Sequence, residues 1–466
     1  MSMKPISADR LSTIVSGKIT HGPSVNIHYG AYRLKQVKHK NTVLFIEKRI
    51  LSWDELKPFF PLVLVTEWKY SAHELPSQVT VIEVEESEEA FWKFTYFYRN
   101  QFQLPVVAIT GTAGKTTTKE MTKHILSSYM KVTATQLSTN SRTAYFQYLL
   151  NIEEDTEVAV IETAVGAPGD ILNAGSYFKP TVGIITNIGA HHLNYCKTLE
   201  GYIDAKSEML EILDDNGTLI INADDENTKK INFQKFNGKL IKIGRSLSND
   251  YAASNIQYGE NGMEFLVHYQ GQKHHVEVSG YGEHQVYNAL AAIAASVEVG
   301  LSISQAIAPL RTYRPLNKQL QLFKGLNGAL IIDDTWSITT TSLEAGLKVL
   351  NELAGRRKRV AIIGTITDIG SWGVFIHQQA GEIIFNEGVD ILITVGEHAR
   401  IMGDYALKLG IKADVYSFNN GILAYYLLKD LVDQNSVILI KGDMYSKTMF
   451  ELASNLKNKE WNPPHF

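Results

Sequence analysis

The sequence contains little that would place the chain in a membrane, an oxidising compartment or a complex with a polyanion. Its 466 residues include one cysteine, Cys196, so no internal disulfide can form, which fits a reducing compartment. No apolar run approaches the roughly 20 residues of a membrane helix, and residues 1–7 hold no apolar segment of the signal-peptide kind. The formal net charge of −4 gives no reason to expect nucleic acid or an anionic membrane as a partner. We therefore expect a cytoplasmic protein.

Internal repeats and low-complexity segments are absent as well. Short apolar runs instead alternate with helical patterns through most of the chain, which is typical of an α/β fold with largely parallel sheets. At about 150 residues per domain, the length suggests three domains. We expect a small α/β domain over residues 1–102, a central domain with a mostly parallel sheet over 103–314, and a doubly wound, Rossmann-like domain over 315–466.

The apolar runs also predict individual elements. Helices are expected over residues 86–102, 115–129 and 287–299, the last of them ended by Gly300. Residues 255–280 alternate in the manner of antiparallel strands. The other predicted strands cover residues 42–46, 62–65, 79–84, 106–109, 158–162, 182–186, 219–222, 329–332, 359–363, 391–395 and 437–440.

A glycine-rich turn joins the predicted strand at 106–109 to the helix that follows it. Glycines let backbone N–H groups approach an anion and the helix N-terminus adds positive potential, so this turn is a candidate phosphate site. Lys115 is the candidate for neutralising the β- and γ-phosphates of a nucleotide, and the Thr116 hydroxyl for binding Mg²⁺. The standard phosphate loop has a glycine where this chain has Ile109, so the loop is a shortened variant. The residues predicted to bind ATP here are Thr110, Gly111, Thr112, Ala113, Gly114, Lys115, Thr116 and Thr117.

The pattern Gly-Thr-x-Gly-Lys-Thr-Thr at residues 111–117 resembles the phosphate loop of the Mur ligase superfamily. The resemblance covers about residues 75–450 and is strongest to the ligases that add D-alanyl-D-alanine to UDP-N-acetylmuramoyl-tripeptide. It implies an ATP-dependent enzyme that joins a carboxylate to an amine through an acyl phosphate and releases ADP and phosphate. The central domain would bind ATP and the first domain a substrate. The implied partners are a small-molecule carboxylate donor and amine acceptor, and we expect a monomer, with a dimer left open.

The resemblance further implies a site for Mg²⁺, with two ions expected. Glu162 ends an apolar strand, where a carboxylate is costly unless it is paired or metal-bound. His192 matches a family histidine linked to the metal, with His191 as the alternative. Lys206 matches a family lysine that CO₂ carbamylates, and the carbamate can hold Mg²⁺. Glu162 could instead point at solvent. On its own, a histidine pair is more often at the surface or in packing than a ligand, and a lysine on a helix is almost always a solvated charge. The predicted metal ligands are therefore Thr116, Glu162, His192 and Lys206, the last three of them catalytic together with Lys115.

Two positions downstream match the family's nucleotide contacts. Asn288 lies in Gly282-Glu283-His284-Gln285-Val286-Tyr287-Asn288, which is similar to a family motif whose last asparagine reads adenine. Asp334 follows a predicted strand and would hydrogen-bond the ATP ribose. A helix N-cap is the plain alternative for this aspartate.

The positions that would contact the other substrates depart from the family pattern. The predicted substrate-binding residues are those of a loop, Asn140, Ser141, Arg142 and Thr143, together with His377 and Lys441. In this loop Thr143 and Tyr145 replace a glycine and a proline. Gln319 and Met444 each stand where the family has an arginine, a change that is not conservative at a bidentate site.

These departures favour a paralogue that keeps the ligase chemistry and joins a non-standard substrate in specialised peptide or metabolite biosynthesis. The alternative is a genuine cell-wall ligase that adds D-alanyl-D-alanine to UDP-N-acetylmuramoyl-tripeptide. A nucleotide-binding regulator would have no need of Glu162, His192 and Lys206. A kinase is a third alternative. It would release a stable phosphorylated product, whereas a ligase releases free phosphate only when an amine is present.

Overall fold

The computed structural model describes residues 3–50, 52–136, 141–189, 193–213 and 215–457. They form the predicted α/β fold, with sheets of two, nine, six and five strands. The chain divides into two compact units, one of residues 1–108, 129–163 and 172–181, the other of residues 109–128, 164–171 and 182–466. The domain boundaries at 102/103 and 314/315 stay predictions.

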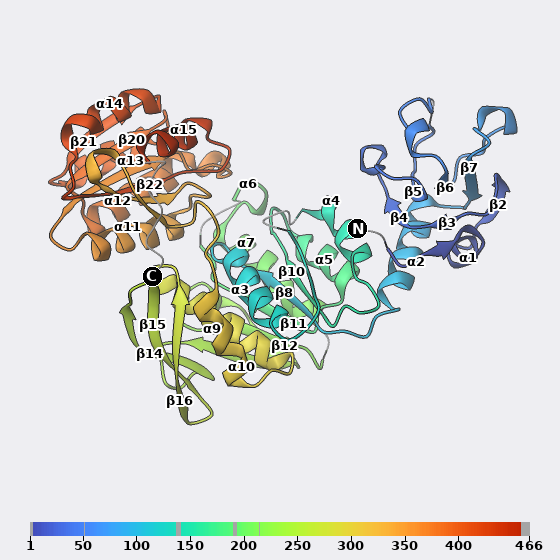
Figure 1. Ribbon diagram of the computed structural model, residues 1–466, viewed down its shortest axis with the longest axis horizontal. Helices are drawn as coiled ribbons and strands as arrows, with labels where there is room; N and C mark the ends of the chain where they lie inside the picture. The colour runs from blue at the N-terminus through green and yellow to red at the C-terminus, as the bar shows by residue number, and fades with distance from the viewer. Residues whose placement is uncertain (1–2, 51, 137–140, 190–192, 214, 458–466) are drawn as a thin grey trace. The chain divides into compact units, whose positions relative to one another are not determined.

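The first unit contains a five-stranded sheet, drawn in blue in Figure 1. Its order is β2 (Lys18–His21), β7 (Val79–Glu83), β6 (Leu62–Thr66), β5 (Thr42–Phe45) and β4 (Tyr29–Ala31). β4 to β7 run parallel, and β2 pairs antiparallel with β7. Every residue of β5 and β6 is buried, as is typical of strands covered on both faces. The three strands predicted before residue 100 are thus confirmed. The first unit also holds β1 (Ile6–Ser7), β3 (Asn26–Ile27), α1 (Ala8–Ile14) and α2 (Ser87–Arg99).

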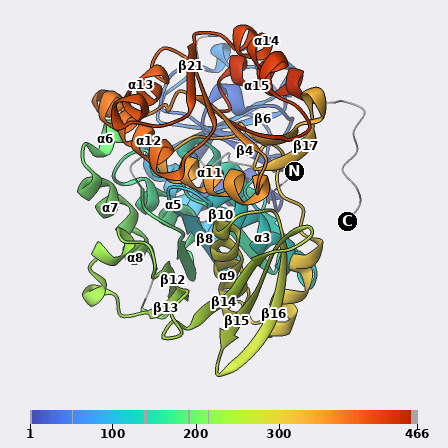
Figure 2. The same ribbon diagram turned by 90° about the vertical axis from the view of Figure 1, so that its left-hand side faces the viewer.

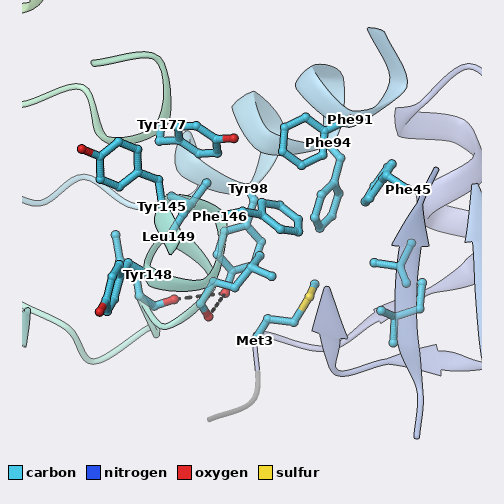
Figure 3. Close-up of a cluster of buried hydrophobic side chains, with 14 of the residues drawn as sticks. Met3, Phe45, Phe91, Phe94, Tyr98, Tyr145, Phe146, Tyr148, Leu149 and Tyr177 are labelled. Carbon is cyan, nitrogen blue, oxygen red and sulfur yellow. Dashed lines mark hydrogen bonds between the residues drawn. The ribbon is translucent and has the colours of Figure 1, made fainter. Parts of the chain in front are cut away.

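An aromatic cluster lies in one hydrophobic core of the first unit (Figure 3). Phe45 of β5 stacks on Phe94 of α2 with ring centroids 5.5 Å apart. Phe91, also on α2, lies 4.8 Å from Phe146 of α4 (Arg142–Leu150). The predicted helix at 86–102 is thus rich in aromatics because its buried face fills this core. The Tyr98 hydroxyl is satisfied too, because it donates to the carbonyl of Ile152 at 3.0 Å.

The nine-stranded sheet carries the predicted phosphate loop. Its order is β16 (Gln272–Ser279), β15 (Gly262–Tyr269), β14 (Tyr251–Tyr258), β13 (Lys239–Gly244), β12 (Thr218–Asn222), β11 (Val182–Ile185), β8 (Val106–Thr110), β10 (Val158–Glu162) and β9 (Val132–Ala134). β11 to β14 pair parallel, whereas β14, β15 and β16 pair antiparallel, as predicted for 255–280. β9 and β13 were not predicted, because β9 has three residues and Lys242 interrupts the apolar residues of β13.

Helices of the second unit flank this sheet. α9 (Glu283–Glu298) packs beside α3 (Lys115–Ser127), as Figure 2 shows. α9 begins four residues earlier than the predicted start at 287, directly after Gly282, so the predicted boundary was wrong. Gly282 has φ +107°, which a helix cannot include. The other helices between residues 160 and 310 are α5 (Asp170–Phe178), α6 (Leu193–Cys196), α7 (Leu199–Ser207), α8 (Met209–Ile212) and α10 (Ile303–Ile307).

The six-stranded sheet follows in the chain and is doubly wound, as predicted. Its order is β17 (Gln321–Lys324), β18 (Leu330–Asp334), β22 (Ser436–Lys441), β19 (Lys358–Gly364), β20 (Ile391–Val395) and β21 (Asp414–Phe418). All pairs are parallel except β17 with β18. β17 and β21 lie at the two edges and were not predicted, because neither strand is fully buried.

Five helices cover the two faces of this sheet (Figure 1). They are α11 (Thr340–Ala354), α12 (Gly373–Glu387), α13 (Arg400–Leu409), α14 (Gly421–Leu431) and α15 (Lys447–Leu456). Ile438 and Ile440 share a core with α14 and α15, whereas Leu439 between them lies near Gly346 of α11. Alternation along β22 thus places α11 and α14 on opposite faces. Among the described residues no helix is both long and apolar enough to span a bilayer.

Candidate active site

The phosphate loop has a backbone that requires its two glycines. Gly114 has φ +82°, and a Cβ there would lie 2.4 Å from Asn288 Oδ1. Gly111 has φ +149°, and its Cβ would lie 1.9 Å from Thr186 Oγ1. L side chains rarely adopt these angles, and neither position has room for one. α3 begins at Lys115 directly after the loop, so the positive end of a helix dipole adjoins a loop shaped for an anion.

Asn187 holds the loop in place, a role that the sequence did not predict. Its Oδ1 accepts the backbone N–H of Ala113 at 3.0 Å, and its Nδ2 donates to the carbonyl of the same residue at 2.9 Å. The Asn187 carbonyl accepts the N–H of Thr112 at 2.9 Å. Thr186 donates its hydroxyl to the Ala113 carbonyl at 2.7 Å. The signal in the sequence was an asparagine two residues after a buried strand, where polar residues of α/β proteins collect.

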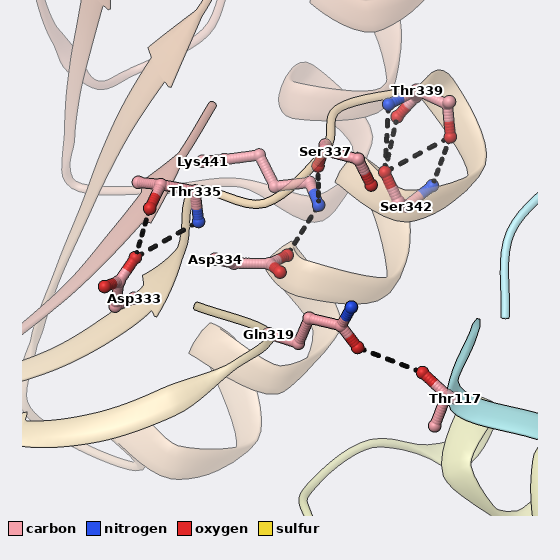
Figure 4. Close-up of polar contacts among 9 residues, drawn as sticks. All are labelled: Thr117, Gln319, Asp333, Asp334, Thr335, Ser337, Thr339, Ser342 and Lys441. Carbon is pink, nitrogen blue, oxygen red and sulfur yellow. Dashed lines mark hydrogen bonds and ion pairs between the residues drawn. The ribbon is translucent and has the colours of Figure 1, made fainter. Parts of the chain in front are cut away.

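The side chains of the loop make contacts of their own. Lys115 Nζ donates to the Thr112 carbonyl at 3.0 Å, so the ammonium is folded back over the loop. Thr117 donates its hydroxyl to Gln319 Oε1 at 3.0 Å (Figure 4). Thr116, the predicted Mg²⁺ ligand, lies half-buried in the first turn of α3. Lys115 and Thr116 therefore lie at the helix start as predicted, whereas the Thr117 hydroxyl contacts another part of the chain.

Lys206 is fully buried on α7, next to the start of the loop. Its Nζ donates to Thr110 Oγ1 at 3.4 Å and lies 4.5 Å from the centroid of the Tyr202 ring. Burial, with the neighbouring Lys115 ammonium as the second cause, lowers the pKa of Lys206 well below its usual range. This side chain is therefore not the solvated charge that a lysine on a helix usually is.

Glu162 is buried at the carboxyl end of β10, with 1% of its surface exposed. Its backbone N–H donates to Thr135 Oγ1 at 2.9 Å. Within the described residues, no three His, Cys, Asp or Glu side chains are grouped as metal ligands. Three predicted positions, Asn140, His191 and His192, lie outside the described residues. Of the predicted metal ligands, Thr116, Glu162 and Lys206 therefore lie within the described residues, and their binding of a metal stays a prediction.

Asn288 lies on α9 and supports the loop. Its Oδ1 accepts the Thr118 hydroxyl at 3.2 Å, and its Nδ2 donates to Gln285 Oε1 at 3.4 Å. The same Oδ1 occupies the space that a side chain at Gly114 would need. Asn288 therefore shapes the loop, and its predicted contact with adenine stays a prediction.

Asp334 ends β18 and is paired with a lysine of the neighbouring strand (Figure 4). Lys441 Nζ lies 2.5 Å from Asp334 Oδ2 and 2.8 Å from the Ser337 carbonyl. Burial raises the pKa of Asp334, and the Lys441 charge opposes that shift. The N-cap of α11 is Thr339, so the helix-cap alternative for Asp334 was wrong.

His377 lies on α12, and both of its ring nitrogens bond to backbone groups. Nε2 accepts the N–H of Ile366 at 3.2 Å, and Nδ1 lies 2.7 Å from the Gly373 carbonyl, which it contacts as a donor. This arrangement defines a neutral tautomer. Burial lowers the pKa of His377 below its usual value. Both ring nitrogens of His377 thus already have hydrogen-bond partners. The predicted contact of His377 with a substrate stays a prediction.

The described part of the predicted substrate loop is largely helical, which corrects the sequence interpretation. Ser141 is the N-cap of α4, and Arg142 is its first residue. Arg142 is exposed, and the Thr143 carbonyl accepts Gln36 Nε2 at 3.0 Å. Tyr145 is 1% exposed and packs against aromatic rings, because α4 turns this side chain into the core of the first unit.

The chain is similar to known proteins over most of its length. Residues 109–296 match the Mur ligase middle domain family. The UDP-N-acetylmuramoyl-tripeptide–D-alanyl-D-alanine ligase of Escherichia coli (strain K12) is 30% identical over 319 residues, which are 68% of this chain and 70% of that protein. The enzyme of the same name from Bacillus subtilis (strain 168) is 27% identical over 394 residues, covering 84% and 82% of the two chains.

Solved structures agree in fold. MurF from Acinetobacter baumannii superposes with a TM-score of 0.84 at 23% identity, covering 97% of this chain and all of that one. MurF from Thermotoga maritima, solved in complex with ADP, gives a TM-score of 0.77 at 20% identity over 92% of this chain and 97% of that one. The shaped phosphate loop, the match of the middle domain and the similarity over more than two thirds of a relative together show that this chain belongs to the Mur ligase family, whose members are ATP-dependent, ADP-forming ligases.

Proposed function

We propose that this chain joins a carboxylate to an amine with ATP. The carboxylate oxygen attacks the γ-phosphorus and ADP leaves, which gives an acyl phosphate. The amine nitrogen then attacks the acyl carbon, phosphate leaves, and the amine loses a proton as the amide forms. The observation that carries this proposal is the buried Lys206 amine, 3.4 Å from the hydroxyl of Thr110, at the start of a loop shaped for phosphate.

The protein's own groups would act by position and charge. Lys115 and the α3 N-terminus adjoin the expected place of the β- and γ-phosphates and would neutralise the charge that develops there. Thr116 and Glu162 carry oxygen donors of the kind that Mg²⁺ prefers, so their chemistry fits this ion. His192 and a carbamate on Lys206 would complete the predicted set. Bound Mg²⁺ would supply charge neutralisation on the phosphates. Asp334 would accept a hydrogen bond from the ribose, and Asn288 would contact adenine.

Lys206 fits the predicted carbamate for a physical reason. An amine adds CO₂ in its neutral form, and the amine of Lys206 is buried away from water beside the Lys115 charge. The carbamate would be an anion, which the positive neighbour would stabilise. The buried position therefore favours addition of CO₂ to Lys206, which a solvated, protonated lysine would resist.

The identity of the substrates is a second part of the proposal. Gln319, Thr143 and Tyr145 replace family residues, and each has a partner within the chain: Gln319 contacts Thr117, Thr143 contacts Gln36, and Tyr145 lies in a core. These replacements support a paralogue with a non-standard substrate. The second candidate is addition of D-alanyl-D-alanine to UDP-N-acetylmuramoyl-tripeptide, which the names of the similar proteins favour at least as strongly.

One assay separates these candidates. ADP and phosphate release are measured with UDP-N-acetylmuramoyl-tripeptide and D-alanyl-D-alanine, each alone and together, and Lys115→Ala serves as the inactive control. Robust turnover that needs both substrates would establish the cell-wall reaction and exclude the paralogue. No turnover with this pair, followed by amine-dependent phosphate release with another pair from a substrate panel, would support the paralogue. Release of ADP with a stable phosphorylated product would instead indicate a kinase.

A further inference from the structure

We propose that Lys441 is a positioning residue for the ribose of the nucleotide, acting through Asp334. This inference rests on the proposed contact between Asp334 and the ribose. It gives Lys441, which the sequence assigned to substrate binding, a different role. Lys441 would hold the carboxylate in one orientation and would not contact the ribose itself.

The geometry of the two strands places these residues side by side. β18 and β22 are parallel neighbours, and Asp334 is the register partner of Lys441. Both residues therefore end their strands at the same edge of the sheet, where ligands of doubly wound proteins bind. Lys441 is 1% exposed and Asp334 7% exposed, so the pair lies away from bulk water, where one partner strongly determines the position of the other.

Lys441 also connects the carboxylate to the loop that follows β18. Its Nζ donates to Asp334 Oδ2 at 2.5 Å and to the Ser337 carbonyl at 2.8 Å (Figure 4). The backbone N–H of Leu320 donates to Asp334 as well. An ionised carboxylate can accept about four hydrogen bonds, so these two donors leave it capacity for a hydroxyl group. The carboxylate is thus oriented from two sides and still able to accept.

Gln319 extends this arrangement to the phosphate loop. Leu320, which donates to Asp334, follows Gln319 directly in the chain, and Gln319 accepts the Thr117 hydroxyl from α3 at 3.0 Å. The carboxylate proposed for the ribose is therefore tied through two adjacent residues to the helix proposed for the phosphates. A nucleotide that contacts the Asp334 carboxylate and the start of α3 would therefore bind groups whose relative positions are already fixed.

The neighbouring Asp333 provides a matched comparison. It is fully buried, its Oδ1 accepts the N–H and hydroxyl of Thr335 at 3.1 and 2.7 Å, and its Oδ2 pairs with Lys457. Adjacent residues of a strand point to opposite faces of the sheet. Asp333–Lys457 is therefore an ion pair of the same kind on the other face, and removing it should cost stability without affecting ribose recognition.

The test measures nucleotide binding and needs no knowledge of the other substrates. The dissociation constants of ADP, 2′-deoxyADP and 3′-deoxyADP are measured by calorimetry with Mg²⁺ for the parent, Asp334→Asn, Lys441→Met and Lys457→Met. The parent is expected to bind ADP about tenfold more tightly than the analogue that lacks the contacted hydroxyl, as for a hydrogen bond to a charged group. Asp334→Asn and Lys441→Met should both bring this ratio close to one, whereas Lys457→Met should keep it.

The outcomes separate the two levels of the proposal. If the parent discriminates, Asp334→Asn does not, and Lys441→Met still does, the role of Lys441 is overturned and the ribose contact of Asp334 stands. If the parent shows no discrimination at all, both are overturned, while ligase activity is judged by the assay above. If thermal unfolding shows that Lys441→Met does not fold, Lys441→Ala, which also has no hydrogen-bond donor, replaces it. An unchanged ratio in Lys441→Ala would also overturn the proposal.

Discussion

Asn288 Oδ1 lies 2.4 Å from the place that a Cβ on Gly114 would take, so a residue of α9 limits the shape of the phosphate loop. The same oxygen accepts the Thr118 hydroxyl at 3.2 Å, which fixes it against α3. The loop is therefore defined as much by α9, far along the chain, as by its own glycines.

We predict that Gly114→Ala weakens nucleotide binding by roughly tenfold or more, because a left-handed backbone strains any L side chain by about 1–3 kcal/mol and Asn288 leaves no room for the methyl group. Calorimetry with ADP and Mg²⁺ measures the effect. Gly410→Ala is the matched control, since Gly410 has φ +89° but nothing within 4 Å of its Cβ position. Equal nucleotide affinity in both variants would show that the loop tolerates a side chain.

Lys206→Ala is expected to reduce turnover by on the order of 10²–10³-fold, the range seen when a group that stabilises developing charge is removed. Added acetate or formate should restore part of the activity, because a small carboxylate can occupy the space of the carbamate. Lys119→Ala is the control, since Lys119 is also fully buried but pairs with Glu120. Near-normal activity of Lys206→Ala, or equal recovery of both variants with acetate, would refute the carbamate.

His284 should make the stability of the protein depend on pH. Burial, with the Lys441 charge as the second cause, lowers the pKa of His284 to about 4, below its usual 6.5. Between these values the unfolded chain binds more protons than the folded one, so the free energy of unfolding falls as the pH drops from about 6.5 towards 4. Between pH 7 and pH 5 we expect a loss of about 2 kcal/mol from this group.

Urea denaturation of the parent and of His284→Gln at pH 7 and pH 5 measures this loss. The variant should show a smaller difference between the two pH values, since it has no imidazole to protonate. The same difference in both proteins would mean that other groups cause the pH dependence.

Phe146→Ala is predicted to destabilise the first unit by about 3–5 kcal/mol, the usual cost of removing a buried aromatic ring. Phe146 is fully buried and contacts rings from β5 and α2. Tyr96→Ala is the comparison, because Tyr96 lies on α2 with 42% of its surface exposed and should cost less than about 1 kcal/mol. Chemical denaturation followed by aromatic fluorescence measures both, and equal costs would contradict the packing argument.

Much of the fold could be predicted because strands and helices differ in local periodicity. The central strands Leu62–Thr66, Val106–Thr110 and Ser436–Lys441 are buried along their whole length and stand out as nearly continuous apolar segments. The edge strands β9, β17 and β21 escaped prediction, because a short or half-exposed strand has no such run. The start of α4 at Arg142 was also missed, because the sequence around this residue has no pattern that distinguishes a helix from a loop.

The phosphate loop could be predicted from the sequence alone, because its glycines, lysine and threonines lie together in one short segment. The motifs around Glu162, Lys206, Asn288 and Asp334, on which the resemblance to the Mur ligase family rested, are also short segments of sequence. The tertiary structure was needed to show that Asn187 and Asn288 hold the loop, that Lys206 is buried against Thr110, and that Asp334 pairs with Lys441. These contacts join residues far apart in the chain, and no local pattern specifies the strand order, such as β22 beside β18, that brings them together.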